Sequence, residues 1–187
     1  MIKFKEINTV SNYLSLLRLL LAIPFWILLD NFNSLRYVLF ALAIFGALTD
    51  IFDGYFARRL NQVTEFGKII DPLADKICIG IIITKLFLIN QIPAYYFYMI
   101  IGRDLLIFLG GIFITKKLGK VLPSNMLGKI TVFIIGIVIL LIMIGIDQGT
   151  IIYKIIYYAS LLLIVGSFIG YALRASEFVK GNKYGSF

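Results

Sequence analysis

The sequence contains no histidine and a single cysteine, Cys78, in 187 residues. Without histidine the chain has neither an imidazole metal ligand nor an imidazole base. One cysteine allows no internal disulfide framework and no cysteine metal cluster. Any catalytic base must therefore come from another residue type, and a carboxylate is the most plausible one.

Charge is also scarce. Charged residues make up 15% of the chain, whereas hydrophobic residues make up 60% and the mean hydropathy is +0.96. An ordinary soluble domain is about half apolar and about a quarter charged. So short a chain cannot bury this much apolar surface in one water-soluble core, and its low charge is untypical of a disordered chain. The composition therefore indicates an integral membrane protein.

The apolar residues fall into six stretches, each close to the roughly 20 residues that a bilayer-spanning helix needs. The loops between them are short, so neighbouring helices are expected to be antiparallel. We expect an all-α integral membrane protein with six transmembrane helices in a single membrane domain over residues 1–187, with a short interfacial segment from Met1 to Ser11 before the first span. The predicted spans are 14–33, 37–57, 68–90, 93–115, 125–146 and 151–173.

The basic residues predict the orientation of these spans, because cytoplasmic loops carry an excess of Lys and Arg. With a cytoplasmic N-terminus, the segments facing the cytoplasm hold most of them, so both termini are expected there. The net charge of +8 then needs no nucleic acid, since it reflects anchoring near anionic lipid headgroups. The predicted cytoplasmic set is Lys3, Lys5, Arg58, Arg59, Lys68, Lys116, Lys117, Lys120, Lys129, Arg174, Lys180 and Lys183, against Arg36, Lys85 and Lys154 on the other side.

Four of the ten acidic residues lie within two neighbouring predicted spans, at their cytoplasmic ends. Asp50 and Asp53 are three residues apart, and Asp71 and Asp75 are four apart, so each pair shares a helix face. Carboxylates inside a membrane are costly and usually functional. Four close carboxylates repel one another unless they bind protons or cations, and all-oxygen ligands suit Mg²⁺, Mn²⁺ or Ca²⁺. The pattern therefore predicts a two-metal site for phosphoryl transfer.

Two other interpretations of these acids are open. They could form structural salt bridges with the basic residues around them, or they could be the ion site of a small cation transporter. A transporter is expected to hold its ion near the bilayer midplane, whereas these acids lie at the cytoplasmic edge. The basic residues available for salt bridges are Arg58, Arg59, Lys68 and Lys76.

Residues 50–75 read Asp-x2-Asp-Gly-x2-Ala-Arg-x8-Gly-x3-Asp-x3-Asp. This pattern resembles the signature of the CDP-alcohol phosphotransferase (CDP-alcohol phosphatidyltransferase) family of membrane enzymes. A second resemblance lies in the first span, where Asn12, Ser15 and Arg18 are similar to the Asn-x2-Thr-x2-Arg of that family. The stretch 71–76 resembles phosphatidylglycerophosphate synthases and CMP-forming cardiolipin synthases.

The resemblance implies transfer of a phosphatidyl group from CDP-diacylglycerol to an alcohol, with release of CMP, by a homodimer acting at the cytoplasmic face. It implies two divalent cations, Mg²⁺ or Mn²⁺, bound by Asp50, Asp53, Asp71 and Asp75. Asp71 and Asp75 would be the catalytic pair, with Asp75 also the general base. The residues implied to hold the nucleotide are Gly54, Ala57, Arg58, Gly67, Asn12 and Thr64.

The alcohol acceptor is less strongly indicated. Arg103 and Lys129 match positions where phosphatidylglycerophosphate synthases hold glycerol phosphate, although Arg103 could instead pair with Asp104 and Lys129 could be a snorkelling helix-end lysine. Gly111 and Thr131 stand where those synthases typically carry a further Arg and Lys. The best prediction is glycerol-3-phosphate, with phosphatidylglycerol or inositol phosphate as alternatives.

Tyrosines gather near the ends of two predicted spans. They are typical of the interfacial aromatic belt of a membrane protein. The set is Tyr95, Tyr96, Tyr98, Tyr153, Tyr157 and Tyr158.

Overall fold

The computed structural model describes residues 10–59, 67–118 and 126–184. These ranges form six α-helices and one 3-10 turn and contain no strand, which confirms the all-α prediction. The predicted interfacial segment before Val10 lies outside them. The elements are α2 (Val10–Leu28), η1 (Leu29–Asn31), α3 (Phe32–Arg59), α4 (Gly67–Leu88), α5 (Ala94–Leu118), α6 (Met126–Ile144) and α7 (Ile151–Tyr184).

The helices carry the apolar surface expected of a membrane protein. Large apolar side chains point outward, as at Leu162, which is 76% exposed, and Phe133, which is 68% exposed. Lipid is the natural surrounding for such side chains, since in water they would favour aggregation. Four stretches of the described residues are long and apolar enough to cross a bilayer, and the first of them runs through α2, η1 and α3; the predicted count of six spans therefore stays a prediction. They are Ser15–Thr49, Ala94–Ile114, Met126–Ile144 and Ile151–Glu177.

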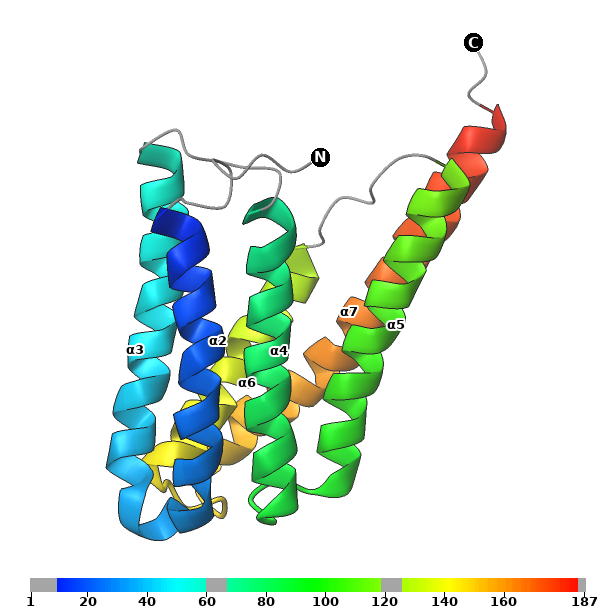
Figure 1. Cartoon of the computed structure of the whole chain (residues 1–187). Coiled ribbons are helices and arrows are strands. Elements are labelled where there is room, and N and C mark those ends of the chain that lie inside the picture. The colour runs from blue at the N-terminus through cyan, green and yellow to red at the C-terminus, as the bar shows by residue number, and fades with distance from the viewer. Residues whose placement is uncertain (1–9, 60–66, 119–125, 185–187) are drawn as a thin grey trace. The chain divides into compact units, whose positions relative to one another are not determined.

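The chain divides into two compact units, and the first covers residues 1–92. In this unit α2 packs against both α3 and α4 and lies between them (Figure 1). In Figure 1 the three helices run down, up and down. The beginning of α2, the end of α3 and the beginning of α4 therefore lie at the same end of the unit (Figure 1). The prediction that residues 1–187 form a single domain is not tested by this division.

A buried charge lies at the opposite end of the first unit. The Lys85 ammonium is 2.6 Å from Asp30 Oδ1 and 4.6 Å from the centre of the Trp26 ring. Lys85 is only 8% exposed, whereas the Asp30 side chain is 60% exposed. The ion pair and the cation–π contact together tie η1 and α2 to the last turn of α4.

The second unit covers residues 93–187, and α7 packs there against both α5 and α6. Helices α5 and α7 run in the same direction (Figure 1). Two polar contacts join them in the same register: the hydroxyls of Tyr96 and Ser160 lie 2.9 Å apart, and seven residues further along both helices Arg103 Nε donates to Ser167 Oγ over 3.2 Å. A repeat of seven is the spacing at which a residue returns to the same face of a helix pair.

The tyrosines divide between the interior of this unit and its surface. Tyr96, Tyr153 and Tyr157 are buried, and the Tyr96 and Tyr157 rings pack with their centres 4.7 Å apart. The belt prediction is wrong for these three, because their rings are buried in this unit: Tyr157 packs against Tyr96 of α5 and also stacks on Tyr153. It agrees only with the exposed side chains of the others, Tyr95, Tyr98 and Tyr158.

Candidate active site

The four aspartates lie on the two helices expected from their spacing. Asp50 and Asp53 belong to α3, and Asp71 and Asp75 belong to α4. Because both segments are α-helical, each pair lies on one face of its helix. The end of α3 and the beginning of α4 share the same end of the first unit (Figure 1). The backbone therefore brings both halves of the pattern to one place, while the four side chains lie outside what the structure describes.

The residues expected to hold the nucleotide share this end of the unit. Three of them belong to the last turns of α3, one is the first residue of α4 and one lies in the first turn of α2. Their side chains lie outside the described set, as does Thr64 altogether, so their nucleotide roles stay predictions. The α3 residues are Gly54, Ala57 and Arg58, and the other two are Gly67 and Asn12.

A hydrogen bond joins α2 to α4 close to this end of the unit. Arg18 is buried and donates through Nη2 to Ser15 Oγ over 3.2 Å, while the Cys78 thiol donates to the Arg18 carbonyl over 3.3 Å. Cys78 lies three residues beyond Asp75, so this bond joins α2 to α4 within one helical turn of the α4 aspartates. The sequence offered no signal for the thiol's role, because its partner is a backbone carbonyl 60 residues away.

The donor set at this end suits a hard divalent cation. Among the described side chains, no group of three or more Asp, Glu, Cys or His could hold a metal, but the four aspartates are not in that set. Each offers carboxylate oxygens only, and oxygen donors suit Mg²⁺ and Mn²⁺ better than zinc. The residues that the helices gather here fit the expected ions.

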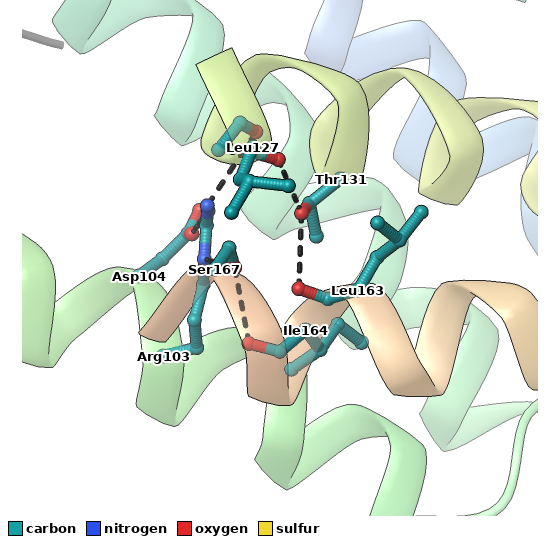
Figure 2. A network of polar contacts seen from close by, with 8 residues as sticks. Arg103, Asp104, Leu127, Thr131, Leu163, Ile164 and Ser167 are labelled. Atoms are coloured by element: carbon teal, nitrogen blue, oxygen red, sulfur yellow. Dashed lines mark hydrogen bonds and ion pairs between the residues drawn. The ribbon is translucent and has the colours of Figure 1, made fainter. Parts of the chain in front are cut away.

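Arg103 lies in the second unit, where its guanidinium is buried (Figure 2). Its Nη1 donates to Asp104 Oδ1 over 2.5 Å, its Nε to Ser167 Oγ over 3.2 Å and its Nη2 to the Gly128 carbonyl over 3.5 Å. Helices α5, α6 and α7 therefore meet at this one side chain. This ion pair is the one expected under the alternative in which Arg103 pairs with Asp104. Acceptor binding by Arg103 stays a prediction.

Thr131 is fully buried between α6 and α7. Its hydroxyl lies 2.6 Å from the Leu127 carbonyl and 3.1 Å from the Leu163 carbonyl (Figure 2). Where the resemblance leads one to expect a lysine, this chain therefore has a hydroxyl that joins two helices. A lysine here would bury its ammonium in the same contact, at a high cost in free energy.

Gly111 is the other departure from the expected pattern. A Cβ atom at this position would lie 3.2 Å from the hydroxyl of Tyr171, which comes from α7. The tyrosine therefore occupies space next to the position from which an arginine side chain would begin. Any larger residue at 111 would have to displace that hydroxyl.

Lys129 is exposed on the first turn of α6. Its ammonium makes no hydrogen bond or ion pair that is found among the described residues. This exposure agrees with a lysine that reaches toward the headgroup region. Its role in binding the acceptor stays a prediction.

A family model for CDP-alcohol phosphatidyltransferase matches residues 8–169. The match includes the whole aspartate pattern and the cluster around Arg103. The chain belongs to the CDP-alcohol phosphatidyltransferase family. The family resemblance drawn from residues 50–75 is thereby confirmed, as are the enzyme class and its place in phospholipid synthesis.

Related phosphatidyltransferases match along nearly the full chain. A protein of Aquifex aeolicus named CDP-diacylglycerol–glycerol-3-phosphate 3-phosphatidyltransferase is 34% identical over 178 residues, covering 91% of this chain and 97% of the relative. A protein of the same name from Rickettsia bellii is 33% identical over 183 residues, covering 95% and 97%. A probable phosphatidylglycerophosphate synthase of Mycobacterium tuberculosis is 28% identical over 181 residues, covering 94% and 86%.

Proposed function

We propose that this phosphatidyltransferase transfers the phosphatidyl group of CDP-diacylglycerol to glycerol-3-phosphate, forming phosphatidylglycerophosphate and CMP. The choice of glycerol-3-phosphate as the acceptor is supported by the near full-length match to relatives named for this reaction. The observation that supports the donor is the complete aspartate pattern, placed on α3 and α4 at one end of the first unit.

The four aspartates are the proposed metal ligands. Asp50 and Asp53 would hold two Mg²⁺ or Mn²⁺ ions together with Asp71 and Asp75. Divalent cations bound there would offset the negative charge that spreads over the phosphoryl oxygens in the transition state. The α-helical spacing within each pair supports this assignment.

Asp75 is the proposed general base. Its carboxylate would take the proton of the acceptor hydroxyl as that oxygen attacks the phosphorus next to diacylglycerol. The new bond joins the acceptor oxygen to phosphorus, the phosphoanhydride bond breaks, and CMP leaves with the electron pair. A chain without histidine has few alternatives for this role.

The donor nucleotide is proposed to lie over the last turns of α3. Gly54 and Ala57 leave room for its close approach, and Arg58 can bind its phosphates as a fork of N–H donors. Gly67 begins α4, and the positive end of a helix favours an anion. Asn12 and Thr64 are proposed to contact the same nucleotide.

The acceptor phosphate is proposed to bind Arg103 and Lys129. A second candidate acceptor is phosphatidylglycerol, as in CMP-forming cardiolipin synthases. It is favoured by one observation: this chain has uncharged Gly111 and Thr131 where two further cations would help to bind the dianion of glycerol-3-phosphate.

We propose that the chain has six spans, that both termini and the active site lie on the cytoplasmic side of the membrane, and that the protein is a homodimer. The excess of basic residues at one set of helix ends supports this orientation. Cysteine labelling from either side of sealed vesicles tests it: a cysteine introduced at residue 3 or 183 should react only from the cytoplasmic side, with the labelling of native Cys78 in the parent protein as the baseline.

One assay tests the reaction. Purified protein in lipid nanodiscs is incubated with CDP-diacylglycerol, Mg²⁺ or Mn²⁺ and one acceptor at a time: glycerol-3-phosphate, phosphatidylglycerol, inositol phosphate or serine. Phosphatidylglycerophosphate and CMP in equal amounts, from glycerol-3-phosphate alone, would support the proposal. Cardiolipin from phosphatidylglycerol would replace the acceptor, and metal-ion flux across proteoliposomes without any CMP would favour a transporter.

A further inference from the structure

The guanidinium of Arg103 is held by two residues outside the predicted site. Ser167 on α7, which Figure 2 shows beside Arg103, accepts from Nε, and the backbone carbonyl of Gly128 on α6 accepts from Nη2. The Ser167 hydroxyl also lies 3.0 Å from the Ile164 carbonyl, to which it donates its proton. Because that proton is committed to α7, the oxygen presents a lone pair to Arg103.

Gly128 provides the space for this arrangement. A Cβ atom at position 128 would lie 3.1 Å from Arg103 Nη2. That separation is tighter than a normal contact, so a side chain here would push the guanidinium away from the Gly128 carbonyl. A glycine at the beginning of α6 therefore allows the arginine to approach the backbone.

The three bonds use only some of the N–H donors of the guanidinium. Arginine has five N–H donors, and the bonds to Asp104, Ser167 and Gly128 use one donor on each nitrogen. For the second N–H of Nη1 and of Nη2, no acceptor is found among the residues that the structure describes. Two such neighbouring donors match the two-pronged geometry with which arginine binds phosphate.

We infer that Ser167 and Gly128 are positioning residues for the acceptor: they hold the Arg103 guanidinium through Nε and Nη2 so that its two remaining N–H groups bind the acceptor phosphate. This inference rests on the proposed function, because it assumes that Arg103 meets that phosphate. Ser167 itself touches no substrate in this arrangement. Its loss should therefore weaken acceptor binding more than the chemical step.

The chain provides a matched control in Ser160, one heptad before Ser167 on the same face of α7. Ser160 is just as buried, and its hydroxyl also donates to a carbonyl of its own helix, that of Tyr157, over 2.6 Å. Its partner on α5 is Tyr96 instead of a cation. Ser160→Ala therefore removes the same kind of helix–helix contact without touching Arg103.

The experiment compares Ser167→Ala with Ser160→Ala in the assay described above, with KM measured separately for glycerol-3-phosphate and CDP-diacylglycerol. A hydrogen bond to a charged group is worth enough that Ser167→Ala should raise KM for glycerol-3-phosphate on the order of tenfold. The KM for CDP-diacylglycerol should stay unchanged, and Ser160→Ala should leave both KM values unchanged. Ser167→Thr keeps the hydroxyl and should recover most of the acceptor affinity.

Gly128→Ala gives a second test at the other anchor, and it decides the question if Ser167→Ala does not fold. It should also raise KM for glycerol-3-phosphate alone. Equal KM values for the acceptor in wild type and in the Ser167 and Gly128 variants would overturn the positioning role. A wild-type enzyme that forms no product from glycerol-3-phosphate would instead refute the proposed function, so the two failures are distinguishable.

Discussion

Removing Asp30 and removing Lys85 from their ion pair should have very different effects on the stability of the protein. Lys85 is buried at the end of α4, but Asp30 is mostly exposed. Asp30→Asn removes the negative charge and leaves the ammonium buried beside the Trp26 ring. Lys85→Met removes the buried charge, fills a similar volume and leaves a carboxylate that water can solvate. The first variant should therefore be the less stable one.

The expected size follows from the burial of each partner. Removing one partner of a fully buried pair costs about 3–5 kcal/mol, and the exposure of Asp30 reduces this to about 2 kcal/mol for Asp30→Asn. Lys85→Met loses a cation–π contact of about 0.5–1 kcal/mol and is relieved of the cost of burying a charge. Its net effect should lie within about 1 kcal/mol of wild type.

Thermal unfolding followed by tryptophan fluorescence measures both variants, because Trp26 is the only tryptophan and lies at this contact. At about 2–4 °C per kcal/mol for a chain of this size, Asp30→Asn should lower Tm by about 4–8 °C. The double variant should resemble Lys85→Met, since no buried charge is left to lose its partner. A Lys85→Met variant less stable than Asp30→Asn, or additive losses in the double variant, would refute this reasoning.

Three further predictions concern the catalytic end and the contact between α6 and α7. Asp75→Asn should slow CMP release by about 10²–10⁴-fold, the usual contribution of a general base, with binding of CDP-diacylglycerol kept. Asp147→Asn, which changes a carboxylate in the turn before α7, should leave the rate unchanged, and an active Asp75→Asn enzyme would remove the base assignment. EDTA should stop turnover and added Mg²⁺ or Mn²⁺ should restore it, so turnover in EDTA would exclude the metal site. Thr131→Val should cost about 1 kcal/mol in the free energy of unfolding, whereas Thr131→Lys should fold poorly; equal stability of the two would show that this contact tolerates a buried charge.

Hydropathy could predict that the helices exist, but it could not predict all of their ends. The stretch expected at 68–90 is α4, Gly67–Leu88, and the chain then turns at Asn90, whose φ of 58° is one that asparagine tolerates. The last span was expected to end at 173, yet α7 continues to Tyr184. The charged residues Arg174 and Glu177 lower the hydropathy beyond residue 173. Hydropathy reflects the surroundings of a helix and not its backbone hydrogen bonds, so it could not predict that the helix continues.

The site could be predicted where its residues follow one another in sequence. The aspartate pattern spans 26 consecutive positions and depends only on helical spacing, so its placement on α3 and α4 could be predicted. The contacts of Arg103 were not, apart from its neighbour Asp104. Ser167 is 64 residues away from Arg103, and only the packing register of α5 against α7 selects that serine instead of Ser160.

The ion pair of Arg103 with its neighbour Asp104 also bears on how the protein is made. Helix α5 precedes α6 and α7 in the chain, so Arg103 can enter the membrane before Gly128 and Ser167 are in place to accept its hydrogen bonds. Its carboxylate partner travels on the same helix, at the next position, and the segment can be inserted as a nearly neutral unit. The serines of α7 bond back to their own helix at Tyr157 and Ile164. The hydrogen bonds that these two serines donate therefore lie within α7 and do not depend on the presence of α5 or α6.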